Sequence, residues 1–103
     1  MSVKGQDHTI LIIDDEDDIL DFLSYNLKKE GYKVYTSNDA LDGIQLAKDL
    51  SPSLIILDVM MPELDGFETL RMLREFSDIP VIMLTAKGDE NDKVYGLELF
   101  RYH

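Results

Sequence analysis

The sequence predicts an α/β domain in which a parallel β-sheet is flanked by helices. Three short apolar runs, at residues 9–13, 54–57 and 81–84, each stop abruptly at a polar residue. Unbroken apolar runs of this length are typical of strands that are buried on both faces of a parallel sheet. Segments with apolar residues at helical spacing separate the runs, and this alternation favours right-handed crossovers within one sheet.

The first half of the chain is expected to contain two strands and two helices. The strand at residues 9–13 is followed by acidic residues and then by a helix that ends near Lys29 and Gly31. Acidic residues at the start of a helix, a basic residue in its last turn and a glycine just after it are typical of helix ends. Residues 33–36 alternate in character and indicate an edge strand, and a second helix ends before Pro52. The apolar stripes are Ile19, Leu20, Leu23 and Leu27 in the first helix, and Leu41, Ile44, Ala47 and Leu50 in the second.

The second half repeats this alternation. The third strand, at residues 54–57, precedes a helix that Asp65 and Gly66 open, and the fourth strand, at residues 81–84, precedes a fourth helix over about residues 90–99. The inward positions are Phe67, Leu70 and Leu73 in the third helix, and Val94 and Leu97 in the fourth. A flavodoxin-like, doubly wound sheet with strand order 2-1-3-4 fits this sequence of elements.

Length and charge limit the classes of function. The 103 residues allow one domain, with a flexible N-terminus at residues 1–8 and the folded part at residues 9–103. A formal charge of −11 disfavours binding to nucleic acid and to anionic membrane surfaces. Cysteine is absent, which excludes disulfides and thiolate chemistry. We find no signal region and no apolar run long enough to span a bilayer, so a cytoplasmic location is expected.

Polar residues follow three of the expected strands. Asp14 and Asp15 come after the first strand, Asp58 after the third and Thr85 after the fourth. Because the carboxyl ends of parallel strands lie at the same edge of a sheet, where open α/β sheets bind their ligands, these side chains are expected to converge. Each acid alone is typical of a loop or a helix cap, but their combination favours a functional site.

Three converging carboxylates require a counter-charge. At roughly 6 Å and an effective dielectric constant near 20, each pair repels by roughly 2–3 kcal/mol. Mg²⁺ prefers oxygen ligands and would relieve this repulsion, whereas zinc and copper are disfavoured because no His or Cys lies near the strand ends. A carboxylate beside Mg²⁺ also suits nucleophilic phosphoryl chemistry, in which an acyl phosphate forms and Thr85 could donate a hydrogen bond to a phosphoryl oxygen.

Three segments together resemble the receiver domain of two-component response regulators. They read ILIIDDE at residues 10–16, LDVMMPELDG at residues 57–66 and PVIMLTAK at residues 80–87. The resemblance implies a phosphoacceptor that takes a phosphoryl group from a histidine kinase, and not an enzyme beyond self-catalysed phosphorylation and dephosphorylation. It also implies site roles: Asp58 as phosphoacceptor, Asp15 and Asp14 as Mg²⁺ ligands together with Asp58 and the Met60 backbone carbonyl, and Thr85 as the switch hydroxyl.

The C-terminal segment departs from the family pattern. Residues 85–99 resemble the subgroup whose receivers precede a winged-helix DNA-binding domain, so the resemblance implies control of an output domain that this chain lacks. Family members continue with a fifth strand that carries a Lys-Pro pair and with a fifth helix, whereas this chain ends at residues 100–103. We therefore expect a C-terminally truncated receiver domain with weakened phosphorylation or switching. An exposed edge on the fourth strand would then favour a homodimer or an intertwined assembly.

Other functions stay open on the sequence alone. A truncated receiver could act as an interaction module that is independent of phosphorylation. An aspartyl phosphatase of the haloacid-dehalogenase kind also uses Mg²⁺, but it carries a second Asp two residues after the nucleophile, where this chain has Met60. A nucleotide-binding domain is disfavoured because no glycine-rich loop follows the first strand.

Overall fold

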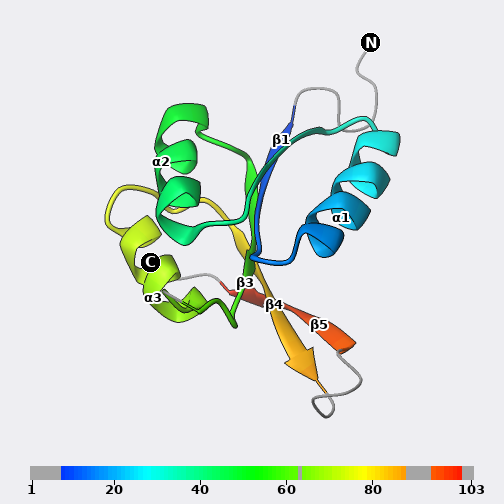
Figure 1. Ribbon diagram of the computed structural model, residues 1–103. Helices are drawn as coiled ribbons and strands as arrows, with labels where there is room; N and C mark the ends of the chain where they lie inside the picture. Colours follow the sequence, from blue (N-terminus) through cyan, green and yellow to red (C-terminus); the bar gives the residue numbers. More distant parts are fainter. Residues whose placement is uncertain (1–7, 63, 88–93, 101–103) are drawn as a thin grey trace.

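The computed structural model describes the backbone of residues 8–62, 64–87 and 94–100, and the side chains up to residue 84 apart from residue 63. A single sheet separates α1 on one face from α2 and α3 on the other (Figure 1). The elements are β1 (Thr9–Ile13), α1 (Asp17–Lys29), β2 (Lys33–Ser37), α2 (Ala40–Leu50), β3 (Leu54–Asp58), α3 (Gly66–Arg74), β4 (Val81–Lys87) and β5 (Val94–Phe100). Of the expected flexible N-terminus, residues 1–7 lie outside the described residues.

The predicted strand order is confirmed. The sheet has the order β2-β1-β3-β4-β5, and the first four strands run parallel. Ile13 pairs with Leu57 across β1 and β3, and Asp58 pairs with Leu84 across β3 and β4. The carboxyl ends of the three central strands are therefore aligned at one edge of the sheet.

The predicted fourth helix is wrong. Residues 94–100 form β5, which pairs antiparallel with the whole length of β4. Paired strands satisfy the backbone N–H and C=O groups that the edge of β4 would otherwise leave open, whereas a helix of about ten residues is marginal without an apolar surface to cover. The expected absence of a fifth strand and the expected exposed edge on β4 are corrected by the same observation. β5 runs antiparallel to β4 and lacks a Lys-Pro pair, so it is not the fifth strand that the resemblance implied.

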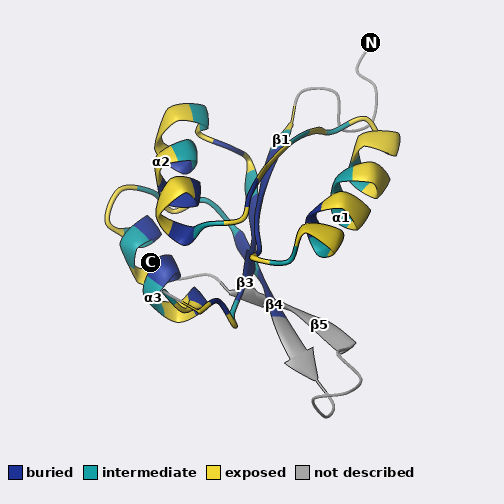
Figure 2. Cartoon of the chain, viewed as in Figure 1, coloured by how far each residue is buried: buried dark blue, intermediate teal, exposed yellow. Residues whose placement is uncertain are grey.

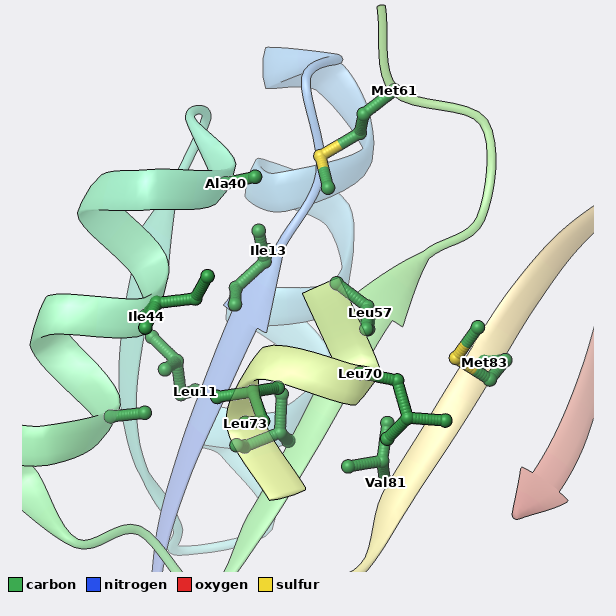
Figure 3. Packing of buried hydrophobic residues seen from close by; sticks show 12 residues of the cluster. Leu11, Ile13, Ala40, Ile44, Leu57, Met61, Leu70, Leu73, Val81 and Met83 are labelled. Carbon is green, nitrogen blue, oxygen red and sulfur yellow. The ribbon is translucent and has the colours of Figure 1, made fainter. Parts of the chain in front are cut away.

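The core lies in two clusters, one on each face of the sheet. The larger is formed where α2 and α3 cover the sheet, and it includes Leu11, Ile44, Leu57, Leu73 and Met83 (Figure 3). The smaller lies under α1, whose outer side is exposed along the whole helix (Figure 2). β1, β3 and the described start of β4 are thus covered on both faces, as their unbroken apolar runs predict, whereas the edge strand β2 is largely exposed.

Two predicted core positions are exposed instead. Leu41 in α2 is 61% exposed and Phe67 in α3 is 52% exposed. Both lie in the first turn of their helices, beyond the side chains that pack on the sheet, while Ala40 and Leu70 are buried.

Among the described residues, no helix has the length and apolar character needed to cross a membrane.

Candidate metal centre

Three carboxylates converge at the carboxyl edge of the central strands, as the sequence predicts. Asp14 and Asp15 directly follow β1, and Asp58 is the last residue of β3. One oxygen from each of the three side chains lies within 4.8 Å of the others. The parallel register of β1 and β3 produces this convergence between positions more than 40 residues apart in the sequence.

Asp14 is completely buried, and half of its carboxylate has no partner. Its Oδ1 accepts a hydrogen bond of 2.9 Å from the backbone N–H of Glu16, which fixes the side chain in a tight turn. Its Oδ2 is buried without a hydrogen-bond partner. A buried polar atom without a partner is unfavourable by about 1–3 kcal/mol, so this oxygen points to a ligand that is not a protein side chain.

Asp58 is equally buried, at 1% exposure, and its orientation is fixed by the following loop. Its Oδ1 accepts a hydrogen bond of 3.0 Å from the backbone N–H of Met60. The N–H of Val59 donates to the carbonyl of Leu84 at 3.0 Å, which ties this loop to β4. Asp15, by contrast, is exposed, so the cluster is buried on one side and open to solvent on the other.

The cluster favours protonated carboxyls in the absence of a cation. The pKa of Asp14 is raised from 3.8 to about 7, chiefly by burial; the hydrogen bond from the Glu16 N–H opposes this rise, and the charges of Asp58 and Asp15 add to it. Burial also raises the pKa of Asp58, with a smaller contribution from Asp15. A divalent cation would remove the repulsion and keep all three groups ionised.

The donor set fits Mg²⁺ better than other common metals. All three side chains offer carboxylate oxygens, which are hard ligands, and the cluster contains no His or Cys. The unpartnered Oδ2 of Asp14 provides an oxygen whose burial is otherwise unexplained. The residues present therefore fit a magnesium site.

The other two predicted site residues are Met60 and Thr85, and the structure places the backbones of both near the carboxylate cluster. Met60 lies in the loop after β3, where its N–H binds Asp58, and its side chain is 67% exposed. Thr85 is the residue of β4 next to Leu84, the pairing partner of Asp58, so the Thr85 backbone lies at the same edge of the sheet. β4 continues to Lys87, so Thr85 lies within the strand rather than at its end, and its side chain lies outside the described part.

Gly66 allows α3 to pack directly against the backbone of Asp58, a role that the sequence analysis missed. It begins α3, and its N–H donates to the carbonyl of Val59 at 2.9 Å. A Cβ at this position would lie 2.6 Å from the Cα of Val59 and 2.7 Å from the carbonyl oxygen of Asp58. Only glycine allows the helix to approach the backbone of Asp58 this closely.

Gly66→Ala is therefore expected to lower the free energy of unfolding by about 1–3 kcal/mol, because the methyl group meets backbone atoms that cannot rotate away. Urea unfolding followed by circular dichroism measures the change. Gly43→Ala in α2 is the matched comparison: the atoms nearest to its methyl group belong to the side chain of Ile13 rather than to the backbone, so a smaller loss is expected. Equal losses in the two variants would contradict the supporting role of Gly66.

Comparison with known proteins agrees with this fold. Residues 10–100 match the family model of the response regulator receiver domain. The N-terminal domain of a response regulator receiver protein from Methanoculleus marisnigri JR1 is 37% identical with a TM-score of 0.74, and the match covers 78% of this chain and 68% of that chain. Chemotaxis protein CheY4 from Vibrio cholerae is 30% identical with a TM-score of 0.72, over 82% of this chain and 72% of that one.

A response regulator receiver domain protein from Clostridium thermocellum gives a similar result. It is 32% identical with a TM-score of 0.74, over 82% of this chain and 69% of that one. The strand order, the placement of the acidic cluster and the family match over residues 10–100 agree with one another. The chain belongs to the response regulator receiver domain family of two-component systems.

Proposed function

We propose that this receiver domain accepts a phosphoryl group on Asp58 from a histidine kinase, with Mg²⁺ held by Asp14, Asp15 and Asp58. The observation that carries the proposal is the half-buried cluster of three carboxylates in which Oδ2 of Asp14 has no partner. A nucleophile, a cation site and an opening to solvent are thereby combined at one edge of the sheet.

The proposed reaction is an in-line transfer. A carboxylate oxygen of Asp58 attacks the phosphorus of a phosphohistidine, the O–P bond forms, and the P–N bond breaks with its electron pair passing to the imidazole nitrogen. The Met60 N–H keeps the Asp58 carboxylate oriented through its bond to Oδ1. Bound Mg²⁺ supplies positive charge that offsets the charge on the phosphoryl oxygens.

Two further roles are part of the proposal. The Met60 carbonyl completes the metal ligands, supported by the position of Met60 two residues after Asp58 in the loop beside the cluster. The Thr85 hydroxyl binds the phosphoryl group after transfer, supported by the position of its backbone next to the pairing partner of Asp58. The proposed output is a DNA-binding domain outside this chain, supported by the resemblance of residues 85–99 to receivers that precede a winged-helix DNA-binding domain. We place this exchange in the cytoplasm.

Incubation with acetyl phosphate tests the proposal. In Mg²⁺ the intact mass is expected to increase by one phosphoryl group, and EDTA is expected to prevent the increase. The adduct should be stable in acid and labile in base, as acyl phosphates are. Steady release of phosphate without an adduct would favour a phosphatase instead. Mg²⁺ binding without any adduct would contradict phosphoacceptor function and favour an interaction module.

A further inference from the structure

A buried serine lies beside the carboxylate cluster and is not used by the proposed reaction. Ser37 is the last residue of β2, and it is 4% exposed. Its backbone carbonyl accepts a hydrogen bond of 3.1 Å from the N–H of Asp14. This bond extends the pairing of β1 with β2 beyond Ile13, the partner of Ser37 in the sheet. Ser37 therefore holds the backbone of a proposed metal ligand.

The side chain of Ser37 fixes the loop that follows β2. Its Oγ accepts a hydrogen bond of 3.2 Å from the N–H of Asp39. The single hydroxyl hydrogen has two acceptors within reach, the Asp39 carbonyl at 2.8 Å and Oδ2 of Asp42 at 3.0 Å. The Asp39 carboxylate in turn caps α2 by accepting the N–H of Asp42 at 2.9 Å. The loop is thereby tied to the end of β2 and to the first turn of α2.

The turn at Ser37 has the same form as the turns at Asp14 and Asp58. In each of them, a side-chain oxygen accepts the backbone N–H of the second residue along the chain. β2, β1 and β3 are neighbours in the sheet, so the three turns form a row along its carboxyl edge. An aspartate at Ser37 would add a fourth carboxylate to this edge, whereas the hydroxyl closes the same turn without charge.

The loop that Ser37 fixes also borders the exposed member of the cluster. A narrow cleft of about 30 Å³ has Asp15 in its lining together with Asn38, Asp39 and Ala40. The loop after β2 therefore meets the cluster at two points. It is bonded to Asp14 through the Ser37 carbonyl, and it lies beside Asp15 at the cleft.

We propose that Ser37 is a positioning residue that holds Asp14 and Asp15 in the geometry that binds Mg²⁺, an inference that rests on the proposed function. The hydroxyl fixes the loop, and the loop fixes the carbonyl that binds the Asp14 N–H. The unpartnered Oδ2 of Asp14 is thereby kept close to the oxygens of Asp15 and Asp58. Removing a group that orients metal ligands typically lowers metal affinity 10–100-fold, so the effect should appear in the affinity for Mg²⁺.

Ser37→Ala removes the hydroxyl and tests this role. Titration calorimetry is expected to show Mg²⁺ binding that is about tenfold weaker than in the wild-type protein. The Mg²⁺ concentration that gives half-maximal labelling by acetyl phosphate should increase by the same factor, while the labelling rate at saturating Mg²⁺ stays close to that of the wild-type protein. A merely structural role would reduce the folded fraction, which circular dichroism measures, and would leave this midpoint unchanged.

Thr69→Val is the matched control, because it also removes a buried hydroxyl. The Thr69 hydroxyl donates to the carbonyl of Asp65 at 2.9 Å within α3, and Thr69 is fully buried. This variant should bind Mg²⁺ like the wild-type protein. A measurement without metal completes the comparison: in EDTA, the Asp14 amide should exchange its hydrogen faster in Ser37→Ala than in the wild-type protein or in Thr69→Val, since its acceptor is no longer held.

The contrary outcomes distinguish this inference from the proposed function. Equal Mg²⁺ affinities of the wild-type protein and Ser37→Ala would overturn the positioning role alone, whereas a wild-type protein that does not bind Mg²⁺ would overturn both. If Ser37→Ala does not fold, Asp42→Ala replaces it, because it removes only an exposed acceptor of the Ser37 hydroxyl. Asp42→Ala should bind Mg²⁺ more weakly than Asp49→Ala, an exposed variant with the same change in charge, and equal affinities of these two would overturn the inference.

Discussion

Asp58→Asn is expected to abolish the phosphoryl adduct that forms with acetyl phosphate and Mg²⁺. The amide has nearly the same shape as the carboxylate, and its oxygen can still accept the hydrogen bond from the Met60 N–H. It carries no negative charge, however, and it is a poor nucleophile towards phosphorus. The variant therefore removes the reacting group while the surrounding loop is retained. Intact-mass measurement over a time course gives the fraction of labelled protein.

Asp65→Asn is the matched control for this substitution. It makes the same chemical change seven positions along the chain, at the exposed N-cap of α3, where the side chain accepts a hydrogen bond of 2.8 Å from the N–H of Glu68. Asn caps helices about as well as Asp, so folding should be preserved. Labelling at the wild-type rate is expected. Labelling of Asp58→Asn at that same rate would place the phosphoryl group on another residue and remove Asp58 from its proposed role.

The sheet could be predicted from sequence because its strands are continuous apolar runs. A continuous apolar run, such as residues 54–57, is typical of a parallel strand that helices cover on both faces of the sheet. The carboxyl ends of such strands lie at one edge of the sheet, and this places Asp14 and Asp58 together. The segment at residues 94–100 was predicted wrongly because its apolar residues fit both periods. Val94 and Leu97 are spaced as on a helix, while Tyr95, Leu97 and Leu99 alternate as in a strand. Pairing with the open edge of β4, a tertiary effect, decides between the two.

The detailed geometry of the carboxylate cluster could not be predicted from the sequence and is seen only in the structure. The sequence indicates that Asp14 lies near a cation, but it does not show that Oδ2 is buried without a partner, since that depends on packing from several elements. The sequence predicts that Gly66 lies at the start of a helix, but its close approach to the backbone of Asp58 becomes visible only when α3 is placed against β3. The turns at Asp14 and Asp58, each closed by an N–H two residues later, are a local signal that sequence analysis can recognise.

Asp14→Asn is expected to stabilise the metal-free protein at neutral pH. The pKa of Asp14 is 3.8 in the unfolded chain and is raised to about 7 in the folded protein. Between these values the folded state binds more protons than the unfolded state, so the free energy of unfolding falls as pH increases through this window. One pKa unit corresponds to about 1.4 kcal/mol, so above pH 7 the buried charge lowers stability by up to about 4 kcal/mol. Asparagine cannot ionise and avoids this loss.

Urea unfolding in EDTA at pH 5 and pH 7.5 measures this effect, and added Mg²⁺ separates it from metal binding. The advantage of Asp14→Asn should be about 4 kcal/mol at pH 7.5 and less than half of that at pH 5, because at pH 5 the folded protein keeps Asp14 protonated while the unfolded chain is only partly past its own pKa of 3.8. Mg²⁺ should stabilise the wild-type protein at pH 7.5, since it binds the folded state alone, and it should stabilise the variant much less. Asp49→Asn, an exposed control, should follow the wild-type protein throughout. If Asp14→Asn were instead less stable than the wild-type protein in EDTA at pH 7.5, the ionised Asp14 carboxylate would be stabilised by the protein itself, and the case for a cation at its unpartnered oxygen would fail.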